Sequence, residues 1–279
     1  SRPSPPLAEM ERMGLLVVLL CCLASASGFT APSLLPTPLR APRGRSGLVS
    51  TRASMKPDDK WNFSRFAQTF TTFNGLPFLG PLGRAATVPR PESAGDSARN
   101  KVMFDFGSLA PQEFNKIWAP LDDVVMGGLS VSRVVLTPEG NAKLEGTTSA
   151  GNNGGFCSAR TRNVNPPFDI SSYTGVGVRV RSDTKTRYKL ILRDTNDWDA
   201  VAWCHSFDLP AQKWVDLKVP FSSFVPVVRG RRVSTRNINP SSIYSVQIML
   251  SKYEYDGELN PLFSEGAFEL QFGPIGAYK

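Results

Sequence analysis

The chain has 279 residues, of which 41% are hydrophobic and 10% aromatic, so it is long enough to form a substantial apolar core. Its formal net charge of +8 is unevenly distributed: residues 1–100 contain 12 Lys and Arg against 6 Asp and Glu, whereas residues 101–279 contain 20 against 18. The second segment is nearly neutral, which argues against a nucleic-acid-binding domain with a strongly basic face.

Residues 1–55 have the pattern of a targeting presequence, with Met10 or Met13 as the expected initiator. The apolar run GLLVVLLCCLASASGF ends in small residues, as a secretory signal peptide does. It falls short of the roughly 20 apolar residues that span a membrane. The next segment, residues 29–54, is rich in Ser, Thr, Pro and Arg and contains no acidic residue, which is typical of a transit peptide.

A signal peptide followed by a transit-like segment that begins at Phe29 resembles the bipartite presequence of proteins imported into plastids of secondary origin. The resemblance implies a plastid location, in the stroma or at the thylakoid surface. Secretion is the main alternative, and it would make Asn62, in the sequence Asn-Phe-Ser, a glycosylation acceptor. Mitochondrial import is the other alternative, although the uncharged apolar run is unlike an Arg-bearing amphipathic helix.

Residues 56–101 are predicted to form a linker that contains one amphipathic helix. Phenylalanines recur there at spacings of three, four and three residues, which places them along one face of a helix. These are Phe63, Phe66, Phe70 and Phe73. Asn74 and Gly75 are expected to end the helix. The stripe is expected either to pack on the chain's own domain or to dock on a partner or membrane surface. Residues 83–100 have the composition of a flexible tether.

Residues 102–279 are predicted to fold as an all-β antiparallel sandwich or jelly roll. Short runs that alternate apolar and polar residues recur between turn signals, and none has the period of a long helix. In GVGVRVR (175–181) the valines point to one face and the arginines to the other, and RYKLILR (187–193) alternates in the same way. One apolar face per sheet is expected when two sheets pack together.

A series of motifs in this segment resembles the complex I intermediate-associated protein 30 domain family. Trp118 precedes DDVVMGGLS, and NNGGF precedes Ser158 and Arg160. The later landmarks DISSYTG, YKL, PF and RGR follow in the same order, and the similarity covers about residues 102–279. The structural motif positions are Trp118, Asp122, Asp123, Gly127, Gly128, Gly154, Gly155, Phe156, Pro220 and Phe221.

The resemblance implies a galactose-binding-like jelly roll without a cofactor, which binds subunits of a membrane electron-transfer complex of photosynthetic or NADH-dehydrogenase type. Peripheral association with the thylakoid or inner membrane is implied as well. Some plastid relatives are linked with message translation, so RNA is a possible partner by analogy alone. Nucleotide binding is not expected, because the sequence contains no GxGxxG or P-loop motif. Three departures from the family pattern lie in loops: Ser182–Thr184, Gly151 and an insertion over residues 252–266.

Asp122 and Asp123 are interpreted as structural residues. A catalytic carboxyl pair needs opposed groups roughly 5–10 Å apart, whereas adjacent residues on an extended strand point to opposite faces. We expect one carboxylate to face solvent and an Asp side chain to cap backbone N–H groups. Gly127 and Gly128 would allow positive φ or a bulge. A hydrolase that uses either aspartate is the alternative.

Asn152 and Asn153 are predicted to form a tight turn, since Asn and Gly tolerate left-handed backbone. The alternative is that their amides line a carbohydrate site beside aromatic side chains. The loop from Arg229 to Arg232, with Arg236 nearby, is expected to be either solvated or a surface for acidic protein or RNA phosphate. The candidate binding residues are Asn152, Asn153, Arg160, Trp214, Arg229, Arg231 and Arg232.

Neither a metal site nor an activated nucleophile is expected. The Asp194, Asp197 and Asp199 group lacks the Gly and terminal Glu of an EF-hand loop. The single histidine, His205, has no recognisable Ser or Cys partner. Cys157 and Cys204 are expected to be buried reduced thiols, with a bridge between them left open.

We therefore expect a non-catalytic assembly or stability factor in a plastid. A carbohydrate-binding module and a mitochondrial complex I assembly factor are the alternatives.

Overall fold

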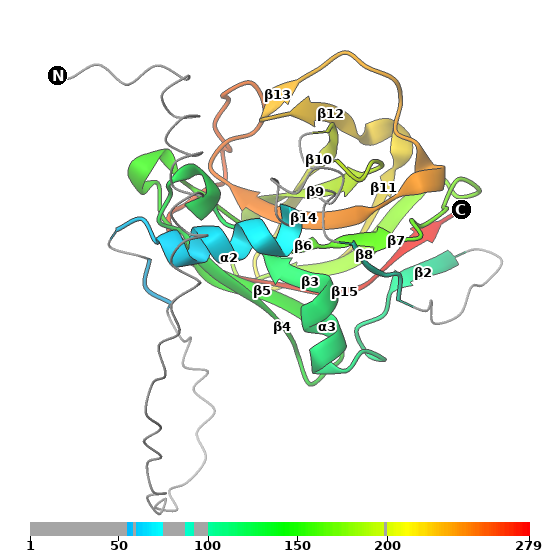
Figure 1. The fold of residues 1–279 in the computed structure, drawn as a ribbon, viewed down its shortest axis with the longest axis horizontal. Helices are drawn as coiled ribbons and strands as arrows, with labels where there is room; N and C mark the ends of the chain where they lie inside the picture. The colour runs from blue at the N-terminus through cyan, green and yellow to red at the C-terminus, as the bar shows by residue number, and fades with distance from the viewer. Residues whose placement is uncertain (1–54, 58–59, 75–86, 92–99, 198–199) are drawn as a thin grey trace, which may run out of the picture. The chain divides into compact units, whose positions relative to one another are not determined.

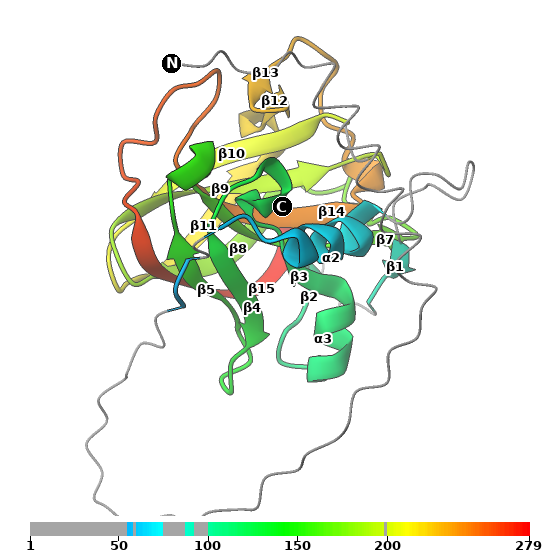
Figure 2. The same ribbon diagram turned by 60° about the vertical axis from the view of Figure 1, so that its left-hand side comes forward.

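The computed structural model of the chain describes residues 55–57, 60–74, 87–91, 100–197 and 200–279. The presequence expected over residues 1–55 lies outside the described residues, apart from Met55. Most of the described strands form two antiparallel sheets that lie as two layers in Figure 1 and Figure 2. The all-β sandwich predicted from strand alternation is confirmed.

The first layer is a seven-stranded sheet in which every neighbouring pair is antiparallel. Its order is β13 (Arg231–Arg232), β12 (Val225–Val228), β10 (Ala202–Leu209), β9 (Thr186–Arg193), β14 (Ser245–Ser251), β6 (Phe156–Thr161) and β3 (Trp118–Pro120).

The second layer is a six-stranded antiparallel sheet in which β15 is the longest strand. Its order is β11 (Trp214–Pro220), β8 (Gly175–Ser182), β15 (Gly266–Tyr278), β5 (Ala142–Thr148) and β4 (Val131–Leu136), with β2 (Asn100–Phe104) also paired to β15. A separate parallel pair joins β1 (Thr87–Pro89) to β7 (Asn163–Asn165), so three residues of the expected tether pair with the domain.

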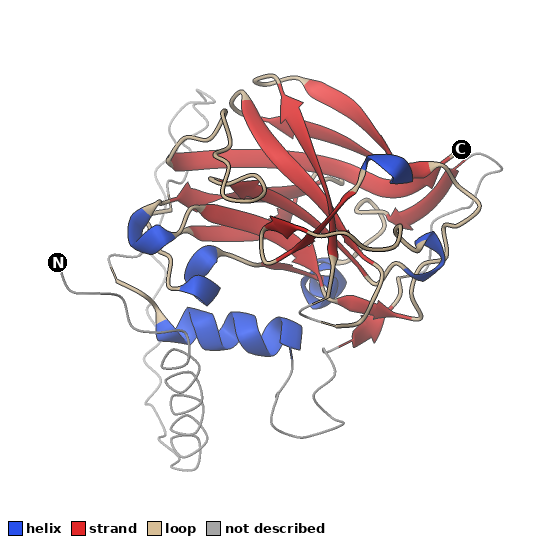
Figure 3. Cartoon of the chain, turned by 90° about the horizontal axis from the view of Figure 1, so that it is seen from above, coloured by secondary structure: helices blue, strands red, loops and turns tan. Residues whose placement is uncertain are grey.

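Figure 3 shows the longest described helix running beside the strands. The described helical segments are few and short. They are α2 (Phe63–Asn74), α3 (Pro111–Ile117) and the 3-10 turns η2 (Asp123–Met126), η3 (Gly151–Asn153), η4 (Phe221–Ser223) and η5 (Pro240–Ser242).

The main core lies between the sheets and is built by the alternation seen in the sequence. Burial of one side chain in every two removes apolar surface from water on the inner face of each sheet. The inward residues of the two strands with the clearest alternation are Val176, Val178 and Val180 of β8 and Tyr188, Leu190 and Leu192 of β9.

The outer face of the seven-stranded sheet carries a second, smaller apolar cluster. It consists of Ile191, Cys204, Val227 and Tyr255. A sheet face that opens only to water would not bury such residues. This outer face is therefore a covered surface, and the elements that cover it position the candidate site.

The predicted Phe-rich helix is confirmed as α2, and it packs on the chain's own domain. The Asn62 side chain accepts from the Arg65 N–H (3.1 Å) at its first turn, as an N-terminal cap does. Trp61 Nε1 donates to Val124 O at 2.8 Å, and Arg65 Nη2 donates to Asp122 Oδ2 at 2.8 Å. Phe73 is buried, with the Arg160 guanidinium 5.2 Å from its ring centroid.

No helix within the described ranges combines the length and the apolar character needed to cross a bilayer.

Candidate functional site

Two sequence motifs that lie about thirty residues apart, DDVVMGGLS and NNGGF, meet at the Asp123 carboxylate. Its Oδ1 accepts from Ser130 N (2.9 Å), and its Oδ2 accepts from Ser130 Oγ (2.5 Å), Gly155 N (2.6 Å) and Phe156 N (3.2 Å). The side chain is fully buried. The expectation that an aspartate caps backbone N–H groups here is confirmed, and the carboxylate also joins the two loops.

The glycines of both motifs make room for this carboxylate. A Cβ on Gly128 would lie 2.2 Å from Asp123 Cγ, and one on Gly154 would lie 2.5 Å from Asp123 Oδ2. The backbone is left-handed at Gly127 (φ 89°) and Gly155 (φ 121°). Asn152 and Asn153 also have positive φ, at 54° and 58°, so the predicted tight turn is confirmed.

Asp122 is buried as well, and the expectation that one of the two carboxylates faces solvent is wrong. Asp122 does not continue an extended strand beside Asp123, because it is the N-cap residue of η2. Its Oδ2 accepts from Ser132 N and Arg65 Nη2, both at 2.8 Å, and its Oδ1 accepts from Ser132 Oγ at 2.5 Å. Burial raises the pKa of Asp122 to about 6, against the lowering effects of Ser132 and Arg65.

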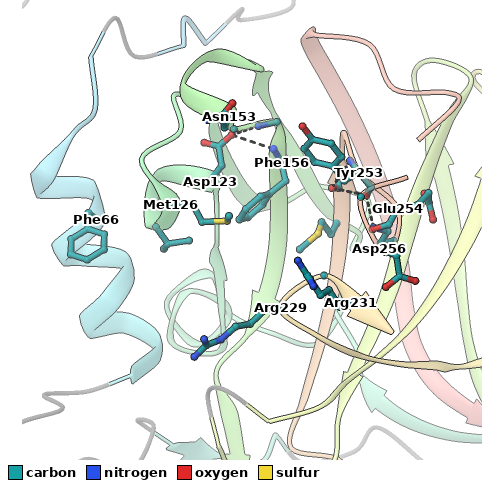
Figure 4. Close-up of a pocket in the computed structure, with 18 of the residues that line it drawn as sticks. Phe66, Asp123, Met126, Asn153, Phe156, Arg229, Arg231, Tyr253, Glu254 and Asp256 are labelled. Atoms are coloured by element: carbon teal, nitrogen blue, oxygen red, sulfur yellow. Dashed lines mark hydrogen bonds between the residues drawn. The ribbon is translucent and has the colours of Figure 1, made fainter. Parts of the chain in front are cut away.

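These contacts place η2 beside a large cavity, which we call the apolar hollow. Its volume is about 990 Å³, within the range of ligand-sized sites. Figure 4 shows α2 on one side, η2 and the NNGGF turn beside it, and Tyr253, Glu254 and Asp256 opposite. The apolar side chains that line it are Phe66, Phe70, Val125, Met126, Phe156 and Met249.

A smaller cavity of about 280 Å³ adjoins the apolar hollow over the outer face of the seven-stranded sheet, and we call it the basic recess. The two cavities share Met126, Phe156, Lys189, Met249 and other lining residues. Cationic side chains line the recess at four positions: Arg160, Lys189, Arg193 and Arg229.

The structure brings together part of the predicted set of binding residues. Asn153, Arg229 and Arg231 line the apolar hollow, and Arg160 and Arg229 line the basic recess. Asn152 instead donates from Nδ2 to Gly127 O at 3.2 Å. Trp214 is on the six-stranded sheet, where Arg179 lies 5.2 Å from its ring centroid, and lines neither cavity.

The predicted docking stripe is divided between the helix's own packing and the cavity. Phe66 and Phe70 line the apolar hollow, and their rings stack with centroids 5.9 Å apart. Phe63 lies 6.2 Å from Phe66 and continues the ring series. The fourth phenylalanine, Phe73, is in the interior.

The basic loop is engaged in ion pairs within the chain. Arg232 Nη1 lies 3.2 Å from Asp256 Oδ2, and its guanidinium lies 5.0 Å from the Tyr255 ring centroid. Arg236 Nη1 lies 2.6 Å from Asp194 Oδ2. Two of the cations considered for RNA or acidic surfaces therefore already have carboxylate partners.

Several cavity residues were missed in the sequence, notably Lys189, Arg193, Met249 and Tyr253. The alternation of RYKLILR placed Lys189 and Arg193 on the face opposite the core, which is correct. Alternation alone could not show that this face is covered. The loop expected as an insertion (252–266) supplies the wall that carries Tyr253 and Glu254.

Other groups considered for chemistry are engaged in the structure. Cys157 and Cys204 are buried and not bonded to each other, and burial raises the pKa of each thiol. His205 Nδ1 lies 3.2 Å from Ser223 O. Within the described part of the chain, no cluster of three His, Cys, Asp or Glu side chains has metal-binding geometry.

Comparison with known proteins gives one family and a set of fold neighbours. The sequence model described as complex I intermediate-associated protein 30 (CIA30) matches residues 104–272. None of the curated proteins matches the sequence.

One similar solved structure is a family 11 carbohydrate-binding module from Clostridium thermocellum, in complex with a β-1,3-1,4-mixed-linked tetrasaccharide. It is 14% identical to this chain, with a TM-score of 0.46, and the match covers 66% of this chain and 97% of that one. The corresponding module of the cellulase Lic26A-Cel5E from the same organism is 15% identical, with a TM-score of 0.44 over 66% and 96%. An agarase is 12% identical, with a TM-score of 0.42 over 65% and 25%. At these identities the likeness concerns the fold and says nothing of what this chain binds.

The two aspartates should respond differently to neutralisation. The pKa of Asp122, about 6 in the folded chain against an ordinary 3.8, means that the folded state binds this proton more tightly. The free energy of unfolding should therefore fall by about 3 kcal/mol as pH rises from about 4 to about 6. Asp122→Asn should flatten this window, because the amide can donate to Ser132 Oγ and still accept from Ser132 N and Arg65. Urea unfolding across pH measures this, and an unchanged profile in Asp122→Asn would contradict it.

Asp123→Asn is the matched comparison at pH 7. Its amide nitrogen would face the Ser130 N–H or the Gly155 and Phe156 N–H groups, so at least one donor would meet another donor. We expect a loss of about 2 kcal/mol, whereas Asp122→Asn should lose less than this. Equal losses in the two variants would show that Asp123 does not join the loops as described.

Substitution of the two adjacent glycines tests two different effects, steric overlap at Gly128 and backbone strain at Gly127. Gly128→Ala should destabilise the chain by about 3 kcal/mol, because its Cβ would overlap the fixed Asp123 side chain. Gly127→Ala should cost only about 1 kcal/mol, because its Cβ meets no atom within 4 Å and the penalty is that of positive φ. Chemical denaturation of both variants measures the difference, and the reverse order would contradict the described packing.

Proposed function

The chain belongs to the complex I intermediate-associated protein 30 family, and we propose on that basis that it is a non-catalytic assembly or stability factor. Its clients in this proposal are subunits of a membrane electron-transfer complex, of photosynthetic or NADH-dehydrogenase type, in a plastid. A mitochondrial location with a complex I client is the alternative within the same class.

The observation that carries this proposal is the apolar hollow. An unfinished subunit of a membrane complex exposes apolar surface, and a cavity walled by Phe and Met side chains can bury part of it. Met126 on the rim is 72% exposed. Methionine side chains are flexible and polarisable, which suits a surface that must accept irregular apolar contacts.

A non-catalytic role agrees with the state of the acidic residues. Both carboxylates of the DDVVMGGLS motif are buried and saturated with donors from the chain itself. A general base needs access to a substrate proton at hydrogen-bond distance, which these groups do not offer. RNA binding has less support, because Arg232 and Arg236 are paired with Asp256 and Asp194.

The location is tested by a fluorescent fusion that carries residues 10–60. We expect it to accumulate in the plastid of an alga with secondary plastids, since the apolar run and the transit-like segment act in succession. Accumulation in mitochondria would support the alternative, an assembly factor for complex I. Secretion would exclude both organelles as the location.

The client role is tested with the tagged full-length chain, purified from organelles in mild detergent. Subunits of a membrane electron-transfer complex should be recovered with the native chain. Met126→Lys should reduce that recovery severalfold, because it places a charge on the apolar rim. Leu259→Lys is the matched control: Leu259 is 64% exposed but does not line the hollow. Recovery of the tagged chain alone would overturn the proposal.

A further inference from the structure

The basic recess has an excess of positive charge that is unusual for a covered surface. Of the residues that line it, Arg160, Lys189, Arg193 and Arg229 are cationic, and Glu254 is the single carboxylate. Arg160 and Lys189 are buried, Arg193 is half-buried and Arg229 is exposed. A cation removed from water is costly unless an anion or several acceptors compensate it.

Arg193 is the clearest case. Its Nη1 donates to the neutral Gln247 Oε1 at 2.9 Å, and its buried Nε has no hydrogen-bond partner among the described residues. Gln247 is itself committed, since its Nε2 donates to Ser158 Oγ at 2.9 Å and that hydroxyl donates to Leu121 O. The charge of Arg193 is therefore met by a neutral amide, and one edge of its guanidinium is unused.

The charged groups near Arg193 do not neutralise its guanidinium. Burial and the charge of Arg193 both lower the pKa of Arg160, which indicates that the two guanidinium groups repel each other. Lys189 Nζ donates to the carbonyls of Tyr253 and Glu254, at 2.5 and 2.9 Å. The Glu254 carboxylate accepts from Ser206 Oγ at 2.5 Å.

The walls of the recess are apolar, and they continue into the apolar hollow. Ile191, Val227 and Leu121 line the recess, and Met126, Phe156 and Met249 line both cavities. A ligand that fits this arrangement has one anionic group and an apolar body. A guanidinium edge matches the two oxygens of a carboxylate in a bidentate pair.

We propose that the basic recess binds a small organic carboxylate, with its carboxylate on the Arg193 guanidinium and its apolar body directed into the apolar hollow. The site adjoins the Asp123 junction, since Asp123 and Phe156 line the apolar hollow, but neither aspartate of the DDVVMGGLS motif binds the carboxylate in this proposal. It is independent of the assembly role, because it is a property of the isolated chain.

The test is titration calorimetry on the isolated full-length chain, with decanoate below its micelle-forming concentration as the probe and decanol as the neutral control. Decanoate should bind, and decanol should bind at least about tenfold more weakly, because it lacks the charge that pairs with Arg193. Failure of decanoate to bind, or equal binding of decanol, would overturn the proposal. Decyl phosphate is a third arm, and tighter binding of decyl phosphate than of decanoate would overturn the assignment to a carboxylate.

Variants of Arg193 locate the site. Arg193→Gln should weaken decanoate binding at least about tenfold. Arg193→Lys should bind with intermediate affinity, because an ammonium keeps the positive charge and loses the bidentate geometry. Arg179→Gln, on the six-stranded sheet, should bind as the native chain does. Without ligand, Arg193→Gln should melt at or above the native temperature, since it removes a half-buried charge whose Nε has no hydrogen-bond partner among the described residues. Unchanged decanoate affinity in Arg193→Gln would contradict the site. A melting temperature of Arg193→Gln below that of the native chain, together with no change in the native chain's melting temperature when decanoate is added, would contradict it as well.

Discussion

The hydrogen bonds to Asp123 are the interaction on which the rest of the site depends. One buried carboxylate accepts from Ser130 on one loop and from Gly155 and Phe156 on another. A buried carboxylate without these donors would be strongly unfavourable, so the two loops can close only when both present their N–H groups to it. The position of η2, and with it the wall that carries Val125 and Met126, follows from this contact.

The outer face of the seven-stranded sheet gains its character from what lies over it. In an isolated sandwich this face would be a polar surface open to water. Here α2, η2 and the loop after β14 surround it, and a small apolar cluster around Ile191 is buried beneath. The ion pair between Arg65 and Asp122 holds α2 to the same turn that Asp123 organises. The cavity is thus built from segments that are distant in the sequence.

The apolar walls suit an apolar ligand surface, whereas the unpaired edge of the Arg193 guanidinium suits an anion. The apolar hollow has mixed charge at its edge, where Arg231 and Asp256 both contribute, and its volume suits part of a protein surface. The basic recess concentrates cations around Arg193, where a single small anion would relieve more electrostatic cost than a large neutral surface. In the two proposals, the client subunit contacts the apolar rim and the carboxylate group lies in the basic recess, and both use the apolar hollow between them.

The sequence alone determined the local structure. Alternation in RYKLILR and GVGVRVR separated inward from outward side chains, the Phe spacing identified the helix of α2, and Asn and Gly marked the turns, because each signal depends on neighbours within a few residues. Only the tertiary structure decided what these elements face. Burial of both Asp122 and Asp123, the covering of Lys189 and Arg193, and the packing of Phe73 depend on segments that lie between about 10 and 90 residues apart. The periodicity of a strand or helix carries no information about such distant partners.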